Sequence, residues 1–128
     1  DMYDDLERLH GVHVTRQVSI HGGHSADFTT QLEALVAQPP HVLANVPIAK
    51  VTDLAAGAYG LAPTTGVRLE LTGGHTVTCR PSGTEPKLKC YIEVVRPPEP
   101  DLHASRSAAN RLAESLVIDV THLFGSAS

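Results

Sequence analysis

The chain has 128 residues, of which 41% are hydrophobic, 19% charged and 4% aromatic, and this size and composition fit one domain with a single core. Its formal net charge of −4 argues against a protein that binds nucleic acid or an anionic membrane surface. No apolar run reaches the roughly 20 residues that span a bilayer, and two cysteines are too few for a disulfide framework. These features predict a soluble, cytoplasmic protein without nucleic-acid or membrane partners.

The N-terminal part predicts a short helix and then a strand. Residues 1–10 have the pattern of one or two helical turns that end at Gly11, and because the chain starts at Asp1 we interpret them as the remnant of a preceding domain or a linker helix. From Val12 to Ile20 apolar and polar side chains alternate, with Arg16 as the exception on the apolar face. This alternation predicts a half-buried strand.

A second helix and a weakly patterned region follow. Apolar residues recur at helical spacing from Ala26 to Ala37, and Pro39 and Pro40 end this helix. Between residues 39 and 65 a short strand is predicted from Ile48 to Leu54 and then a long loop with Gly and Pro. The sequence of residues 39–65 does not indicate a functional role for this region.

The rest of the chain predicts a hairpin, another strand and a final helix. Alternation in 67–71 and 77–79 around Gly73-Gly74 is typical of a tight β-hairpin, and 88–96 alternate as a further strand. Asp101 is placed as the N-cap of a helix that Gly125 closes. The order strand, helix, four strands, helix favours an α+β fold in which two helices cover one face of a largely antiparallel sheet.

The loop between the last two strands, residues 80–87 (RPSGTEPK), concentrates groups that bind anions. Arg80 offers a planar fork of donors, and Ser82 and Thr84 add hydroxyls. Gly83 allows successive backbone N–H groups to turn toward one point, and two prolines stiffen the loop. A proline-flanked turn would explain an isolated Ser-Gly-Thr triplet. All eight positions together predict a phosphate cradle.

Together with Leu88 and Lys89, and followed by Tyr91, Ile92 and Glu93, this loop resembles the phosphate-binding loop of the α-D-phosphohexomutases, the phosphomannomutase and phosphoglucomutase superfamily. The resemblance covers most of the chain, since the elements follow the order of the C-terminal domain, domain 4, of such enzymes. It implies a TATA-box-binding-protein-like fold for residues 11–128, with residues 1–10 as the tail of the third domain.

The resemblance also implies a function. In this family a phosphoserine enzyme with bound Mg²⁺ moves a phosphoryl group between the 1- and 6-positions of a hexose phosphate, and the C-terminal domain grips the phosphate that is not transferred. The resemblance implies phosphate contacts from Arg80, Ser82, Gly83 and Thr84, with Lys89 as a helper. The implied partners are the phosphosugar and the other domains of the same enzyme.

The chain also departs from the family's full pattern. It has no nucleophilic serine loop, no Asp-x-Asp-x-Asp metal cluster and no sugar-binding Gly-Glu-x-Ser-Gly-His loop. We therefore expect no catalytic residue, metal ligand or cofactor in this chain, which would be inactive alone, and Mg²⁺ only in the full-length enzyme.

Two other function classes fit parts of the sequence. The same loop could serve an autonomous phospho-ligand-binding or regulatory module. The sheet surface could serve nucleic-acid or protein interaction, against which the net charge of −4 and the lack of Phe or Trp on the predicted strands speak.

Two pairs of residues, one of histidines and one of cysteines, each allow two interpretations. His21 and His24 could share a metal ion, but no cysteine or carboxylate completes a set nearby, which favours exposed loop histidines. A hairpin folded symmetrically about the 80–87 loop would place Cys79 opposite Cys90, as a disulfide or, in a reducing compartment, as two buried thiols.

Overall fold

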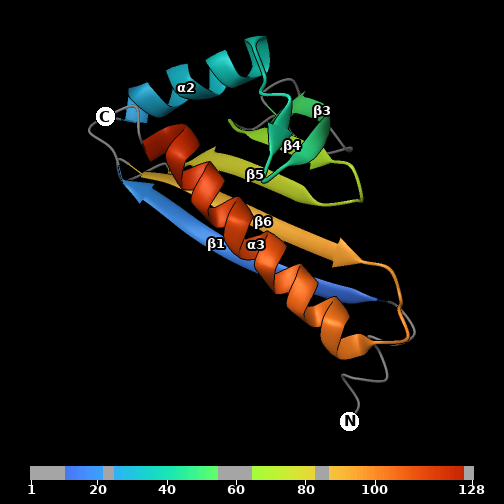
Figure 1. Cartoon of the computed structure of the whole chain (residues 1–128). Helices are drawn as coiled ribbons and strands as arrows, with labels where there is room; N and C mark the ends of the chain where they lie inside the picture. Colours follow the sequence, from blue (N-terminus) through green and yellow to red (C-terminus); the bar gives the residue numbers. More distant parts are fainter. Residues whose placement is uncertain (1–10, 22–24, 55–64, 83–86, 126–128) are drawn as a thin grey trace.

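The structure is a computed structural model that describes residues 11–21, 25–54, 65–82 and 87–125 (Figure 1). Four sequence-based predictions therefore fall wholly or partly outside the described residues: the helix over residues 1–10, the pairing of His21 with His24, the loop that follows Leu54, and the positions of Gly83 and Thr84.

Six antiparallel strands form one sheet in the order β1-β6-β5-β4-β3-β2. The strands are β1 (Val12–His21), β2 (Val42–Leu43), β3 (Val46–Asp53), β4 (Val67–Leu71), β5 (Thr76–Pro81) and β6 (Lys87–Arg96). The helices are α2 (Ser25–Ala37) and α3 (Leu102–Gly125). Figure 1 shows the sheet twisting from the long β1 and β6 to the shorter β3 and β4, with α3 lying along the long pair. None of the helices in the described part of the chain is both long and apolar enough to cross a membrane.

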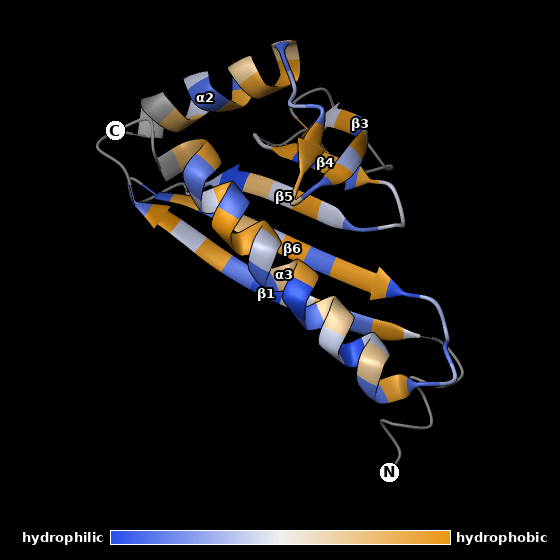
Figure 2. Ribbon diagram, in the orientation of Figure 1, coloured by the Kyte–Doolittle hydropathy of each residue, from blue (hydrophilic) through white to orange (hydrophobic). Residues whose placement is uncertain are grey.

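Both helices pack on the same face of this sheet. Alternation along each strand sends apolar side chains to that face, and Figure 2 shows the corresponding alternation of hydrophobic and hydrophilic segments along the ribbon. One buried cluster joins the strands to both helices; its helical members include Phe28, Leu32 and Leu35 of α2 and Ala109, Ala113, Leu116 and Val120 of α3. The predicted α+β arrangement, with two helices on one face, is thus confirmed, and within the described residues the other face carries no helix.

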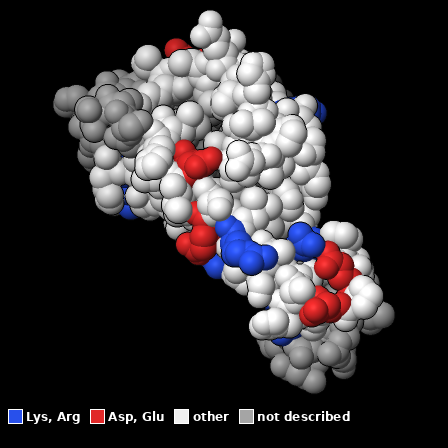
Figure 3. All heavy atoms as spheres, viewed as in Figure 1, with Lys and Arg blue, Asp and Glu red and all other residues white. Residues whose placement is uncertain are grey.

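Contacts with helix α3 explain why Arg16, a charged residue, occupies the apolar face of β1. Its Nε donates to Glu114 Oε1 at 3.1 Å and its guanidinium NH2 donates to Asn110 Oδ1 at 2.7 Å, both on α3. The charged group therefore pairs at the rim of the β1–α3 contact and does not enter the core. In Figure 3, which views the helix-covered face, basic and acidic side chains gather over the lower half of α3, while the upper part carries few.

The described residues contain six strands, one more than the sequence predicted. A two-residue strand, β2, precedes β3, which begins at Val46, two residues before the predicted start. Ala44 and Asn45 connect them with φ values of 51° and 64°, the left-handed conformation of a tight hairpin turn. The Oδ2 of Asp119 on α3 accepts a hydrogen bond from the Ala44 N–H at 2.7 Å. A side chain 75 residues away in sequence thus holds the turn, so local pattern does not reveal it.

Candidate functional site

Arg80 and Lys89, two of the predicted phosphate ligands, lie side by side. They are direct cross-strand partners in the β5–β6 pair. Their chain neighbours Cys79 and Leu88 are fully buried, each with an exposed fraction of 0%, on the helix-covered face, so Arg80 and Lys89 point to the open face. The structure thus places two basic side chains together at the base of the 80–87 loop.

The ends of this loop are joined by a backbone hydrogen bond. The Ser82 N–H donates to the Lys87 carbonyl oxygen at 2.8 Å, and Ser82 is half-buried. The chain therefore leaves β5 and enters β6 at adjacent points. Gly83 and Thr84 belong to residues 83–86, between these two ends and outside the described residues.

Gly66, which precedes β4, lies against Arg80 on the side away from Lys89. A Cβ atom added at Gly66 would lie 3.0 Å from Arg80 Cγ and 2.8 Å from the Cys79 carbonyl oxygen. The missing side chain therefore leaves room for the aliphatic stem of Arg80 to lie close to the backbone. The sequence reasoning missed Gly66, because a glycine just before a strand is a common turn signal and only the fold brings it next to Arg80.

The end of β1 borders the same loop. In the β1–β6 register Ser19 pairs with Lys89 and His21 pairs with Lys87. Ile20, between them, is buried with an exposed fraction of 6%, so Ser19 and His21 share the open face with the basic residues. His24, the proposed metal-sharing partner of His21, lies outside the described residues.

Within the described ranges, no three or more His, Cys, Asp or Glu side chains come close enough together to hold a metal ion such as Mg²⁺. The basic character of the loop base also disfavours a cation, since hard cations such as Mg²⁺ take oxygen ligands, carboxylates above all.

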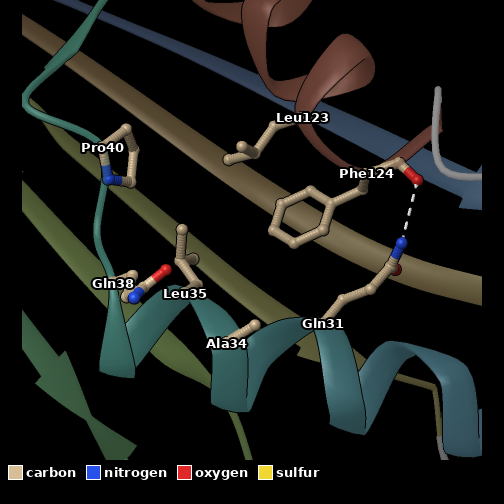
Figure 4. Close-up of a pocket in the computed structure, with 7 residues that line it drawn as sticks. All are labelled: Gln31, Ala34, Leu35, Gln38, Pro40, Leu123 and Phe124. Carbon is tan, nitrogen blue, oxygen red and sulfur yellow. Dashed lines mark hydrogen bonds between the residues drawn. The ribbon is translucent and has the colours of Figure 1, made fainter.

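The helix-covered face has a separate groove, which is not at the loop. It has a volume of about 380 Å³ and lies between α2 and the C-terminal end of α3. Its lining is Gln31, Ala34, Leu35, Gln38, Pro40, Leu123 and Phe124, and Figure 4 shows the Gln31 amide nitrogen donating to the Phe124 carbonyl oxygen, at 3.3 Å. None of these described lining residues is charged, so they are not suited to a phosphate.

The two cysteines are opposite one another, as the symmetric hairpin predicted. Cys79 and Cys90 are direct cross-strand partners, both are free thiols and both are fully buried. A hydrogen bond with Cys90, together with burial, raises the pKa of the Cys79 thiol well above its usual range. Thiols are therefore the form that the structure holds, and Cys79 is not an activated nucleophile.

Comparison with known proteins identifies the family. Residues 33–116 match the model of the phosphoglucomutase/phosphomannomutase C-terminal domain. The chain is 44% identical over 77 residues to a phosphoglucosamine mutase of Bordetella petrii, covering 60% of this chain and 16% of that protein. It is 31% identical over 108 residues to a phosphoglucosamine mutase of Streptomyces coelicolor, covering 84% of this chain and 22% of that protein.

The fold is similar to a solved structure as well. Parafusin from Paramecium, an exocytosis-sensitive phosphoprotein and phosphoglucomutase whose crystal structure is in an open form, matches with a TM-score of 0.55 and 15% sequence identity, over 95% of this chain and 23% of that chain. The chain thus spans only 16% to 23% of the length of these relatives. From the family match over residues 33–116 and this shared fold, the chain belongs to the phosphoglucomutase/phosphomannomutase family and corresponds to its C-terminal domain.

Proposed function

We propose that this domain belongs to a full-length phosphohexomutase that moves a phosphoryl group between the 1- and 6-positions of a phosphosugar. In this proposal the domain binds the phosphate group that is not being transferred. The proposed contacts are Arg80, Ser82, Gly83, Thr84 and Lys89. The proposal rests on one observation above all: Arg80 and Lys89 are cross-strand partners on the open face at the base of the loop.

The physical chemistry of this pair favours an anionic ligand. Like charges directly opposite one another in a sheet cost stability, and an anion seated between them turns this repulsion into attraction. The Arg80 guanidinium can hold two phosphate oxygens at once. A loop whose ends are joined at Ser82 and Lys87 can offer backbone N–H groups to the others.

The role of these residues is positioning and charge neutralisation, not covalent chemistry. In this proposal the phosphoserine and Mg²⁺ belong to other domains of the same cytoplasmic enzyme, so the 128-residue chain alone gives no turnover. We further propose that residues 11–128 form the C-terminal domain with a TATA-box-binding-protein-like fold, and that residues 1–10 belong to the preceding domain.

The names of the curated relatives suggest which sugar to test first. Both relatives described above are phosphoglucosamine mutases. Glucosamine 6-phosphate is therefore the first phosphosugar to compare with inorganic phosphate.

The test is a two-dimensional amide NMR titration of the chain with inorganic phosphate, glucosamine 6-phosphate and hexose 1-phosphates at constant ionic strength. We expect saturable shifts at Ser82, Gly83 and Thr84, with a Kd on the order of millimolar because few contacts must offset the lost freedom of motion. Arg80→Ala should abolish saturation at these three amides.

The matched control is Arg111→Ala, which removes the same charge from an exposed position on α3. It should leave the Kd unchanged. If no amide near Arg80 shifts at tens of millimolar ligand, or if Arg80→Ala and Arg111→Ala behave alike, the proposed phosphate contacts are wrong. Measurable phosphosugar turnover by the chain alone would contradict its proposed non-catalytic role.

A further inference from the structure

Several basic side chains gather at the loop end of the open face of the sheet, and this basic end extends beyond the loop. Two neighbouring rows at this end contain Ser19, Lys89 and Arg80 in one and His21 and Lys87 in the other. Neighbouring strands are about 4.8 Å apart and two residues along a strand span roughly 7 Å. All five side chains therefore fall within one patch, to which β1 contributes Ser19 and His21.

The carboxylates of this face lie at the other end. Glu93 on β6 pairs in register with Thr15 and Thr76, and Glu70 pairs with Thr76. Glu93 is four residues from Lys89, roughly 13 Å along the strand. Among the described residues, no carboxylate occupies an open-face position in the two basic rows.

His21 is the β1 side chain nearest to the closure of the loop. It is the cross-strand partner of Lys87, the residue whose carbonyl accepts the Ser82 N–H. It is exposed and, by alternation with buried Ile20, lies on the open face. An imidazole at this position offers an N–H donor to an anion held at the loop.

We propose that the phosphate site extends onto β1 and that His21 is a further contact to the bound phosphate monoester. This inference rests on the proposed phosphate-binding function and adds a residue from a strand far from the loop in sequence. It gives His21 a role as an anion ligand, instead of the metal ligand that its spacing to His24 suggested. The register of β1 on β6, which only the fold provides, carries the inference.

The experiment titrates four forms of the 128-residue chain with inorganic phosphate and glucosamine 6-phosphate: wild type, His21→Ala, His13→Ala and Arg80→Ala. His13 is a matched control, because it lies on the same face of β1 at the opposite end, where its Nε2 is 3.1 Å from Glu93 Oε2. We expect His21→Ala to raise the Kd about threefold to tenfold, the loss that one ordinary solvent-exposed hydrogen bond gives. His13→Ala should leave the Kd within twofold of wild type, roughly the uncertainty of such measurements.

A direct measurement separates contact from a change in the fold. In wild type the imidazole C–H resonances of His21 should shift with the same Kd as the Ser82 amide, and Arg80→Ala should abolish both. His21→Arg, which restores a donor, should recover most of the affinity. The amide spectrum of His21→Ala outside the patch should stay that of wild type.

The possible failures are distinguishable. If Arg80→Ala abolishes binding but His21→Ala binds as tightly as wild type, the extension onto β1 is overturned and the loop site remains. If wild type shows no saturable shift, the loop site is wrong and the extension falls with it. If His13→Ala weakens binding as much as His21→Ala, the effect is long-range charge and His21 is not a contact.

Discussion

His75, at the turn between β4 and β5, is held as a neutral imidazole. Its Nδ1 accepts a hydrogen bond from the Val95 N–H at 3.1 Å, and its exposed fraction is 9%. Burial, and secondarily the positive charge of Arg96, lower the pKa of His75 from its ordinary value. Because protonated Nδ1 cannot accept the Val95 hydrogen bond, protonation must break this contact.

His75 therefore makes the domain less stable in mild acid. The pKa is lower in the folded state than in the unfolded chain, so the unfolded chain binds more protons and the free energy of unfolding falls as the pH drops below about 6.5. His75→Asn keeps an acceptor near the Nδ1 position but does not titrate. Urea denaturation between about pH 7.5 and about pH 5.5 should show a shallower loss of stability for His75→Asn than for wild type. His103→Asn, at an exposed position on α3, should keep the slope of wild type; equal slopes for all three proteins would refute the assignment.

Asp119 gives a second prediction for a single residue. Its carboxylate accepts the Ala44 N–H in the β2–β3 turn at 2.7 Å. Asp119→Ala should lower the free energy of unfolding by about 1 to 2 kcal/mol and speed hydrogen exchange of the Ala44 amide, because this partly buried N–H loses its acceptor. Asp119→Asn retains a side-chain oxygen and should preserve most of the protection. Unchanged exchange at Ala44 in Asp119→Ala would show that the turn does not depend on this contact.

Among the helices and strands, the sequence predicted those that are determined by local residue patterns. The β4–β5 hairpin, β6 and α3 match the prediction closely, because strict two-residue alternation, Gly73-Gly74 and an N-cap are local signals. Asp101 indeed caps α3, with its Oδ1 accepting the Ala104 N–H at 3.0 Å. The β2–β3 turn was missed for the opposite reason: Ala44 has no intrinsic preference for a positive φ, and its acceptor comes from α3.

The α3 helix approaches β1 and β6 closely because small residues line its inner face. Ala109 and Ala113 are completely buried in the contact with the sheet. Ala113→Leu should therefore overpack this contact and lower the free energy of unfolding by about 1 to 3 kcal/mol, measured by urea denaturation. Ala104→Leu, at an exposed position in the first turns of the same helix, is the control and should change stability by less than about 0.5 kcal/mol. Equal effects of the two substitutions would mean that α3 can shift away from the sheet without cost.

Across the whole molecule, some residues of the candidate site could be predicted from local sequence and others could not. Arg80, Ser82 and Lys89 were accessible to sequence reasoning because one continuous loop carries them. Gly66 and His21 were not, since their proximity to that loop depends on the register of β4 and β1 in the sheet. Motifs of this kind therefore identify the centre of a site, while its border becomes visible only once the strands are paired.

The same sheet places two thiols where they report on unfolding of the whole domain. Cys79 and Cys90 lie in the central strands, completely buried beneath the helices, so a thiol reagent reaches them only when the core opens. Labelling of the native protein should thus be slow and should accelerate with urea in parallel with global unfolding. A ligand that binds only the folded state reduces the open population by the factor 1 + [L]/Kd.

If phosphate binds at the proposed site on the open face, it should slow thiol labelling even though the thiols lie on the other face of the sheet. At ten times its Kd we expect labelling about elevenfold slower in wild type and unchanged in Arg80→Ala. Sodium chloride at equal ionic strength controls for general salt effects. If phosphate slows labelling equally in both proteins, it acts by a general salt effect and not through the loop. If labelling is fast and independent of urea, the thiols are reached by local opening, and the close packing of α3 over β6 does not protect them.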